Sequence, residues 1–196
     1  VGVTEGELVV VARGAADPDL RAATGGEGLV GEALGWRLAL ALVSLIHCSA
    51  AIRTGIDGRT SLSAFTELLR RASERNKSLL CVGLDPDPAR MPVEDVFEFN
   101  RAIIDATFDL VCAYKPNLAF YHGLGEAGYQ ALHRTLEYIP NDIPVIGDSK
   151  CGDVQPTSSF HAKAMFDLWG FDAATVNPYG GHDAVLPFLD YQDKGV

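Results

Sequence analysis

Between Ser61 and Gly181 the chain alternates short apolar runs with segments whose apolar residues recur every three or four positions. Short continuous apolar runs are typical of strands covered on both faces of a parallel sheet, and the three-to-four spacing is typical of amphipathic helices. Four strands are predicted, at Leu79–Leu84, Leu110–Tyr114, from Pro144 through Val145 and Ile146, and at Ala173–Val176. Four helices are predicted, one over Leu62–Ala72 capped by Ser61 or Ser63, one opened by Pro92, one over Tyr129–Ile139 and one over Ala162–Trp169. Strand–helix alternation repeated four times indicates a parallel α/β fold.

Polar side chains follow each of the four predicted strands. They are Asp85 after the first, Lys115 after the second, Asp148 with Lys150 at the third, and Asn177 after the fourth. In (β/α)8 barrels the carboxyl ends of the strands form the catalytic face. Four successive strands that end in this way favour a functional site over a set of solvated charges.

Charged residues are most concentrated at the third strand, in the stretch Asp148-Ser149-Lys150-Cys151-Gly152-Asp153. Side chains alternate along a strand, so Asp148 and Lys150 are expected on the same side. Asp153 follows Gly152 and is expected on the loop beyond the strand. Taken alone, a strand-end ion pair of this kind is also compatible with an ordinary structural role.

Residues 1–60 differ from the rest of the chain. We expect a strand over Glu7–Ala12, a glycine-rich loop over Gly14–Gly35, and a buried or marginal helix over Leu38–Ile46, which is too short to span a membrane comfortably. The glycines do not follow the spacing of a dinucleotide-binding loop. We interpret residues 1–60 as an N-terminal extension of unknown role, either poorly ordered or foreign to the native reading frame.

Composition narrows the class of protein. The chain has 196 residues, which is enough for one domain. Its net charge of −10 argues against nucleic-acid binding. The same charge means that any anionic substrate must be held by local cations. Its four cysteines form no C-x-x-C pair, and no cleavable leader is recognised. This pattern favours free thiols in the cytoplasm over a disulfide or zinc framework, and no membrane association is expected.

Several segments together resemble the orotidine 5′-phosphate decarboxylase family, specifically its type 2 subfamily. The segments are Leu79–Pro88, Tyr114–Tyr121, the Asp148-x-Lys150-x-x-Asp153 core and Thr175–Tyr179. The resemblance runs from about Ser61 to Val196. It implies a (β/α)8 TIM barrel of which about the first four β/α units are present, so that residues 61–196 would be the N-terminal half of a decarboxylase barrel.

The resemblance also implies an activity and its residues. The family converts orotidine 5′-phosphate to UMP in de novo pyrimidine biosynthesis, without a cofactor or metal, and is typically a homodimer. By motif position, the catalytic residues would be Lys115, Asp148, Lys150 and Asp153, with the Asp153 loop entering the neighbouring subunit's site. Asp85 would contact the ribose, and Thr157 matches a family threonine that binds substrate.

The chemistry accounts for these residue types. Loss of CO2 from the pyrimidine leaves negative charge on a carbon that has no adjacent carbonyl. An ammonium beside that carbon stabilises the charge and can then deliver a proton, which is the role expected for Lys150. Asp148 would hold Lys150 protonated and in position, and Lys115 would keep Asp148 ionised.

Two alternatives remain open from the sequence. One is a Mg²⁺-dependent sugar-phosphate decarboxylase or synthase of the same superfamily, which shares the D-x-K-x-x-D core. The other is an inactive truncated fragment that only associates with other chains through the Asp153 loop. The family's phosphate-gripping residues come from later loops, so no phosphate-binding residue is assigned.

Overall fold

The computed structural model describes residues 8–12, 43–45 and 63–196, which form an α/β structure. Its strands are β1 (Leu8–Ala12), β2 (Val43–Leu45), β3 (Leu80–Leu84), β4 (Ala113–Pro116), β5 (Ile146–Cys151) and β6 (Ala173–Val176). Its helices are α2 (Ala64–Asn76), α3 (Val96–Thr107), α4 (Leu118–Gly123), α5 (Gly125–Tyr138), α6 (Thr157–Lys163) and α7 (His182–Leu189), with a π-helical turn η1 (Ala164–Leu168) and a 3-10 turn η2 (Pro178–Gly180).

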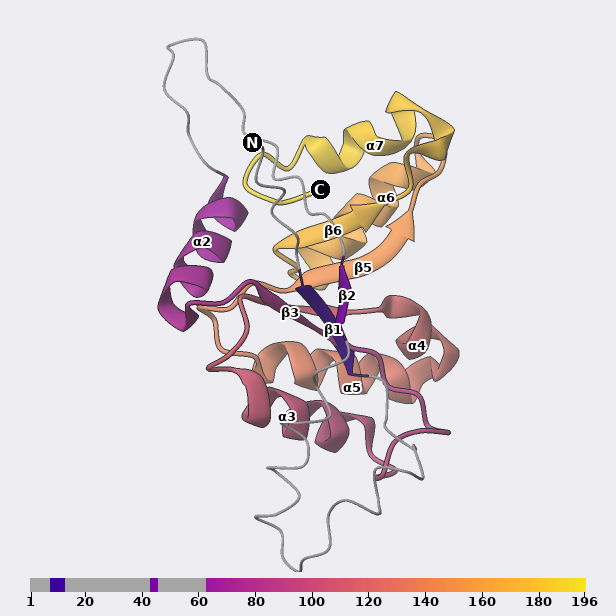
Figure 1. The fold of residues 1–196 in the computed structure, drawn as a ribbon. Helices are drawn as coiled ribbons and strands as arrows, with labels where there is room; N and C mark the ends of the chain where they lie inside the picture. The colour runs from indigo at the N-terminus through magenta and orange to yellow at the C-terminus, as the bar shows by residue number, and fades with distance from the viewer. Residues whose placement is uncertain (1–7, 13–42, 46–62) are drawn as a thin grey trace, which may run out of the picture.

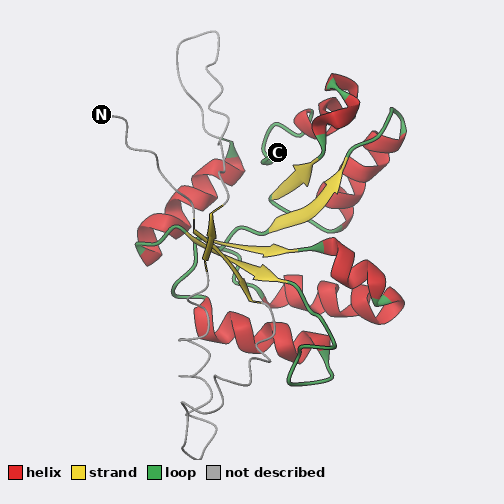
Figure 2. Cartoon of the chain, turned by 45° about the vertical axis from the view of Figure 1, so that its right-hand side comes forward, coloured by secondary structure: helices red, strands yellow, loops and turns green. Residues whose placement is uncertain are grey.

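The strands β3 to β6 lie side by side in chain order and run parallel. β3 pairs with β4, β5 pairs with β6, and two single bridges join β4 to β5, between Tyr114 and Val145 and between Asn117 and Asp148. The other edge of β3 pairs with β1 in parallel, and β1 pairs with β2 in antiparallel fashion. Figure 1 shows the chain passing from strand to helix and back, and Figure 2 shows the strands fanning out with α3, α4 and α5 on one side. The parallel α/β arrangement expected from the sequence is therefore confirmed.

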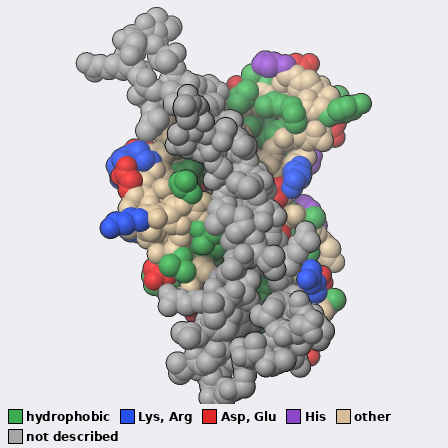
Figure 3. Space-filling view, in the orientation of Figure 1, with side chains coloured by type: hydrophobic (Ala, Val, Ile, Leu, Met, Phe, Trp, Pro, Cys, Tyr) green, Lys and Arg blue, Asp and Glu red, His purple; other side chains and the backbone are tan. Residues whose placement is uncertain are grey.

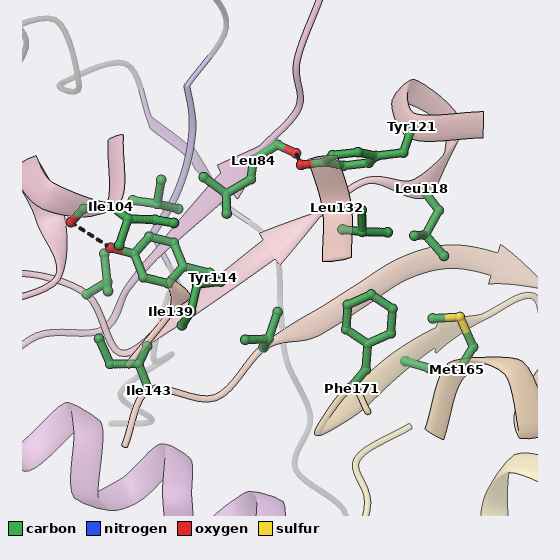
Figure 4. Packing of buried hydrophobic residues seen from close by; sticks show 14 of the residues in the cluster. Leu84, Ile104, Tyr114, Leu118, Tyr121, Leu132, Ile139, Ile143, Met165 and Phe171 are labelled. Carbon is green, nitrogen blue, oxygen red and sulfur yellow. Dashed lines mark hydrogen bonds between the residues drawn. The ribbon is translucent and has the colours of Figure 1, made fainter. Parts of the chain in front are cut away.

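The main core lies between the strands and the helices that connect them. Its largest fully buried side chains include Tyr114 of β4 and Tyr121 of α4 (Figure 4). Around β5, Gly147 leaves room for Met165 and Phe171, because an added Cβ would overlap both side chains. This close approach fixes the strand segment that leads directly into Asp148.

Helix α2 docks on the chain at both of its ends. Ser63 caps its first turn by accepting a hydrogen bond from the Thr66 amide, and the Phe65 amide donates to the carbonyl of Asp193. At the other end Arg75 pairs with Asp142. On the outer face of α2 acidic and basic side chains alternate and form ion pairs, which Figure 3 shows as adjacent red and blue atoms.

Most predicted element positions agree with the structure. The first predicted strand corresponds to β3, the third to β5, and the fourth coincides with β6. Helix α3 begins at Val96 rather than at Pro92, because the Asp95 side chain caps it by accepting from the Glu98 amide. Strand β4 begins at Ala113, three residues later than predicted. Helices α4 and α7 were not predicted.

The predictions for the N-terminal segment are only partly testable. The predicted strand Glu7–Ala12 is confirmed over Leu8–Ala12. The predicted helix Leu38–Ile46 is wrong at Val43–Leu45, where β2 pairs with β1, because an apolar run this short fits either a strand or a helix. The rest of that helix and the predicted loop Gly14–Gly35 lie outside the described residues. In the part of the chain that the structure describes, no helix has both the length and the apolar character that crossing a membrane requires.

Candidate active site at the ends of β4, β5 and β6

The carboxylate of Asp148 lies at the centre of a cluster built by three neighbouring strands. Its Oδ2 accepts a hydrogen bond from Lys115 Nζ of β4 at 2.8 Å. Its Oδ1 accepts from Lys150 Nζ of β5 at 2.6 Å and from the Thr175 hydroxyl of β6 at 2.7 Å. The predicted meeting of Asp148, Lys150 and Lys115 is confirmed as geometry, since both amines contact one carboxylate.

The two lysines differ strongly in exposure. The side chain of Lys115 is 11% exposed and that of Asp148 5%, whereas the side chain of Lys150 is 66% exposed. Lys115 is thus a fixed, buried partner, and Lys150 presents its ammonium to the outside of the cluster. An ammonium held in this way can meet a molecule that arrives at the strand ends.

Asp148 is ionised at neutral pH. Burial raises its pKa, but the hydrogen bonds from Lys115, Lys150 and Thr175 outweigh that effect and lower the pKa to about 2. The ionised carboxylate accepts hydrogen bonds from both lysine amines, one on each oxygen. The cluster carries two positive charges and one negative charge, so it is locally cationic although the whole chain is acidic. A local positive charge of this kind can attract an anionic substrate.

The backbone at Lys150 departs from ordinary strand geometry. Its φ is +50°, in the left-handed region that non-glycine residues seldom adopt. The pairing of β5 with β6 is irregular over the same stretch, between Gly147 and Cys151. The prediction that Lys150 reaches Asp148 is correct, although the simple alternation on which it was based does not continue through Lys150.

Asp85 joins this row of strand ends through Asn117. Asp85 is buried at the end of β3, and its Oδ1 accepts a hydrogen bond from the Asn117 amide at 3.2 Å. Asn117 in turn bridges to Asp148 and caps helix α4 through its side chain. The predicted ribose-contacting carboxylate therefore lies beside the lysine cluster.

Asp153 and Thr157 are exposed residues that follow β5. Asp153 is exposed on the loop after β5, where its Oδ1 accepts from the Val154 amide and its own amide donates to Ser158 Oγ. Thr157 is exposed at the first position of α6. Among the ion pairs of the described residues, none joins Asp153 to Lys115 or Lys150. The predicted loop position of Asp153 is confirmed, and its entry into a neighbouring subunit's site stays a prediction.

Sequence reasoning did not identify Thr175 as part of the site. It contacts both Asp148 and the main chain of Lys150. A signal was present, because Thr175 is the first residue of the family-like segment at the end of the fourth strand.

Within the described residues, no group of three or more His, Cys, Asp or Glu side chains could hold a metal ion.

Comparisons with known proteins agree with this geometry. Residues 78–195 match the model of the orotidine 5′-phosphate decarboxylase / HUMPS family. A relative from Dehalococcoides mccartyi named orotidine 5′-phosphate decarboxylase is 53% identical over 133 residues, which cover 67% of this chain and 49% of the relative. One from Thermomicrobium roseum with the same name is 53% identical over 139 residues, covering 68% and 50%.

A solved structure of the Leishmania donovani OMP decarboxylase is similar in fold. It matches with a TM-score of 0.61 and 36% identity, over 68% of this chain and 51% of that chain. The chain thus spans about half the length of the curated relatives that it matches. The matched segment contains every strand end that builds the lysine–carboxylate cluster, and on this basis the chain belongs to the orotidine 5′-phosphate decarboxylase / HUMPS family.

Proposed function

We propose that the protein decarboxylates orotidine 5′-phosphate to UMP, without a cofactor, in pyrimidine biosynthesis. The observation that carries the proposal is the buried Asp148 carboxylate held between Lys115 and Lys150 at the ends of parallel strands. The names of relatives that are about half identical over this segment support it. As this chain spans about half of those relatives, the activity is proposed for the whole protein.

In this proposal Lys150 acts on the reacting carbon. Departure of CO2 leaves an electron pair on the pyrimidine carbon, and a cation already in position stabilises that pair as it develops. The same ammonium then donates its proton to the carbon, so that the carboxyl group is replaced by hydrogen. The high exposure of the Lys150 side chain fits a group that must meet substrate.

Asp148 and Lys115 would hold Lys150 ready. The ionised Asp148 carboxylate accepts a hydrogen bond from the Lys150 ammonium at 2.6 Å, and this contact holds the ammonium in place. Lys115 is buried against the other oxygen of that carboxylate and fixes its orientation. Asp85, at the end of β3, would bind the ribose.

The finer features of the family complete the proposal. The strands β3 to β6 would be the first four of a (β/α)8 barrel, and the functional unit would be a homodimer in which the Asp153 loop enters the partner's site. Thr157 would bind substrate. Both residues are exposed, as such roles require. The thiol of Cys151 is free, which fits a protein of the cytoplasm.

The Mg²⁺-dependent alternative is less well supported. The family description covers HUMPS proteins as well, but the relatives and the structure reported above carry the decarboxylase name. A metal-dependent activity would be abolished by a chelator, whereas the proposed reaction would not respond to it.

The test uses orotidine 5′-phosphate turnover, followed by chromatographic separation of substrate and UMP. It is run on the 196-residue chain and on a hybrid that joins residues 63–196 to the complementary half of the Dehalococcoides mccartyi relative. The hybrid should form UMP in the presence of EDTA. Lys150→Ala should lower its turnover about 10³-fold or more, and Lys163→Ala, which removes an exposed lysine outside the cluster, should leave turnover unchanged. A folded hybrid that forms no UMP, or a Lys150→Ala hybrid with normal turnover, would contradict the proposal.

A further inference from the structure

The hydroxyl of Thr175 connects the side chain of Asp148 with the main chain of Lys150. It donates a hydrogen bond to Asp148 Oδ1 at 2.7 Å and accepts one from the Lys150 amide at 3.1 Å. The oxygen that it contacts is the one that also accepts from the Lys150 ammonium. A single β6 side chain therefore contacts the two β5 residues that carry the proposed chemistry.

The Lys150 main chain needs such a contact. Among the described residues only Lys77 and Lys150 are non-glycine residues with positive φ. Lys77 ends helix α2, where a left-handed residue is a common cap. Lys150 lies inside a strand, and a conformation of this kind persists only where the surrounding structure enforces it.

A second hydroxyl reinforces the same junction. Ser149 Oγ donates to the carbonyl of Thr175 at 3.1 Å and accepts from the Cys151 amide at 3.3 Å. The irregular stretch of β5 is thus attached to β6 by side-chain hydroxyls at the point where the regular strand pairing shifts. A register shift disrupts the regular ladder locally, and these hydroxyls supply hydrogen bonds at that point.

We propose that Thr175 is a positioning residue, whose hydroxyl orients the Asp148 carboxylate and holds the Lys150 main chain in its left-handed conformation so that the ammonium faces the substrate. The role in turnover depends on the proposed decarboxylase function, but the effect on the two β5 residues does not. A hydroxyl can donate to the carboxylate and accept from the amide at once, whereas an alkyl group can do neither. Serine can therefore replace threonine, and valine, which has nearly the same shape, cannot.

The experiment compares Thr175→Val with Thr175→Ser in the 196-residue chain. Two site-specific signals are read by NMR: hydrogen exchange of the Lys150 amide and the pH titration of the Asp148 side-chain carboxyl carbon. The charged groups that contact Asp148, Lys115 from β4 and Lys150 from β5, are the same in both variants. With valine, the amide should exchange about tenfold faster or more and the carboxyl should titrate at higher pH, because both lose a partner. With serine, both signals should stay near wild type.

Thr107→Val is the matched control. Thr107 is a fully buried threonine, whereas Thr175 is partly buried, and the Thr107 hydroxyl donates to the Ile103 carbonyl in α3 and pairs with the Tyr114 hydroxyl. Its replacement should lower stability without changing the Lys150 or Asp148 signals. If Thr175→Val leaves either signal at its wild-type value, or if Thr107→Val changes them equally, the positioning role is wrong.

A turnover measurement in the hybrid enzyme separates this inference from the proposed function. Thr175→Val should lower kcat by about 10- to 100-fold with little change in KM, since a misplaced reacting group slows chemistry more than binding. Thr175→Ser should restore most of the loss. A hybrid that never forms UMP refutes the decarboxylase proposal, while the two NMR signals still decide the role of Thr175. An active hybrid with an unchanged kcat in Thr175→Val refutes the role in turnover.

Discussion

The two lysines that share Asp148 should differ greatly in their effect on stability. Lys115 forms a buried pair with the carboxylate, and breaking such a pair by removing one partner costs about 3–5 kcal/mol. Asp148 retains Lys150 and Thr175 in a Lys115→Met variant, so we expect the lower end, about 3 kcal/mol. The Lys150 side chain is 66% exposed, and exposed ion pairs contribute about 0–1 kcal/mol. Lys150→Met should therefore cost less than about 1 kcal/mol.

Urea unfolding of the 196-residue chain, followed by circular dichroism at pH 7, measures both effects. With a slope of about 2 kcal/mol per molar urea, Lys115→Met should lower the midpoint by about 1.5 M and Lys150→Met by less than about 0.5 M. The double variant Lys115→Met/Asp148→Asn should be less destabilised than the sum of its single variants, by about 1–3 kcal/mol, because the two buried charges of Lys115 and Asp148 are then removed together. Equal midpoints for the two lysine variants, or strict additivity in the double variant, would refute this assignment of buried and exposed pairing.

Three further predictions test other parts of the site. The pKa of Asp148 is lowered from 3.8 to about 2, so its ionised form stabilises the fold above about pH 4, and about 2 kcal/mol of that stability is lost as the pH falls from about 4 to 2. In urea unfolding, the free energy of unfolding should therefore fall less between pH 5 and pH 2.5 for Asp148→Asn than for the wild type. Tyr121→Phe and Tyr114→Phe each remove one buried hydroxyl and should each lower the free energy of unfolding by about 1–2 kcal/mol in thermal unfolding. Only Tyr121→Phe should also raise KM for orotidine 5′-phosphate in the hybrid, because the Tyr121 hydroxyl donates to the carbonyl of Leu84, just before Asp85. Gly152→Ala should lower stability by about 1–3 kcal/mol in urea unfolding, because the added Cβ would overlap a main-chain carbonyl oxygen, and a variant as stable as wild type would contradict this packing.

The strands and the central ion pairs were predictable because they depend on local pattern. Each strand is a short apolar run, and each ends in a polar residue, so that Asp85, Lys115 and Asp148 could be assigned to one edge of a parallel sheet. The helices that escaped prediction lack such a pattern. Helix α4 has six residues and begins directly after Pro116 and its Asn117 cap, and helix α7 contains Pro187, a residue that normally indicates a helix end.

The contacts of Thr175 and the conformation of Lys150 could not be predicted from the sequence. Both depend on the register between β5 and β6, which shifts within the motif itself. Regular alternation along the strand correctly places Lys150 near Asp148, but it predicts an extended backbone at Lys150 in place of the left-handed conformation that the structure has. The predicted role of Asp153 depends on a second subunit, and no property of one chain alone determines that arrangement.

The unequal burial of the two lysines has a consequence for repeated turnover. If Lys150 moves toward a bound pyrimidine and donates its proton, Asp148 still has a cationic partner, because the buried Lys115 remains at its other oxygen. The carboxylate then stays charged and correctly oriented while Lys150 is away, and attracts the amine back once it is protonated again. Asp148 therefore keeps one fixed cation, Lys115, while the other, Lys150, moves, and the cluster can return to its starting state after each proposed turnover without movement of the strands.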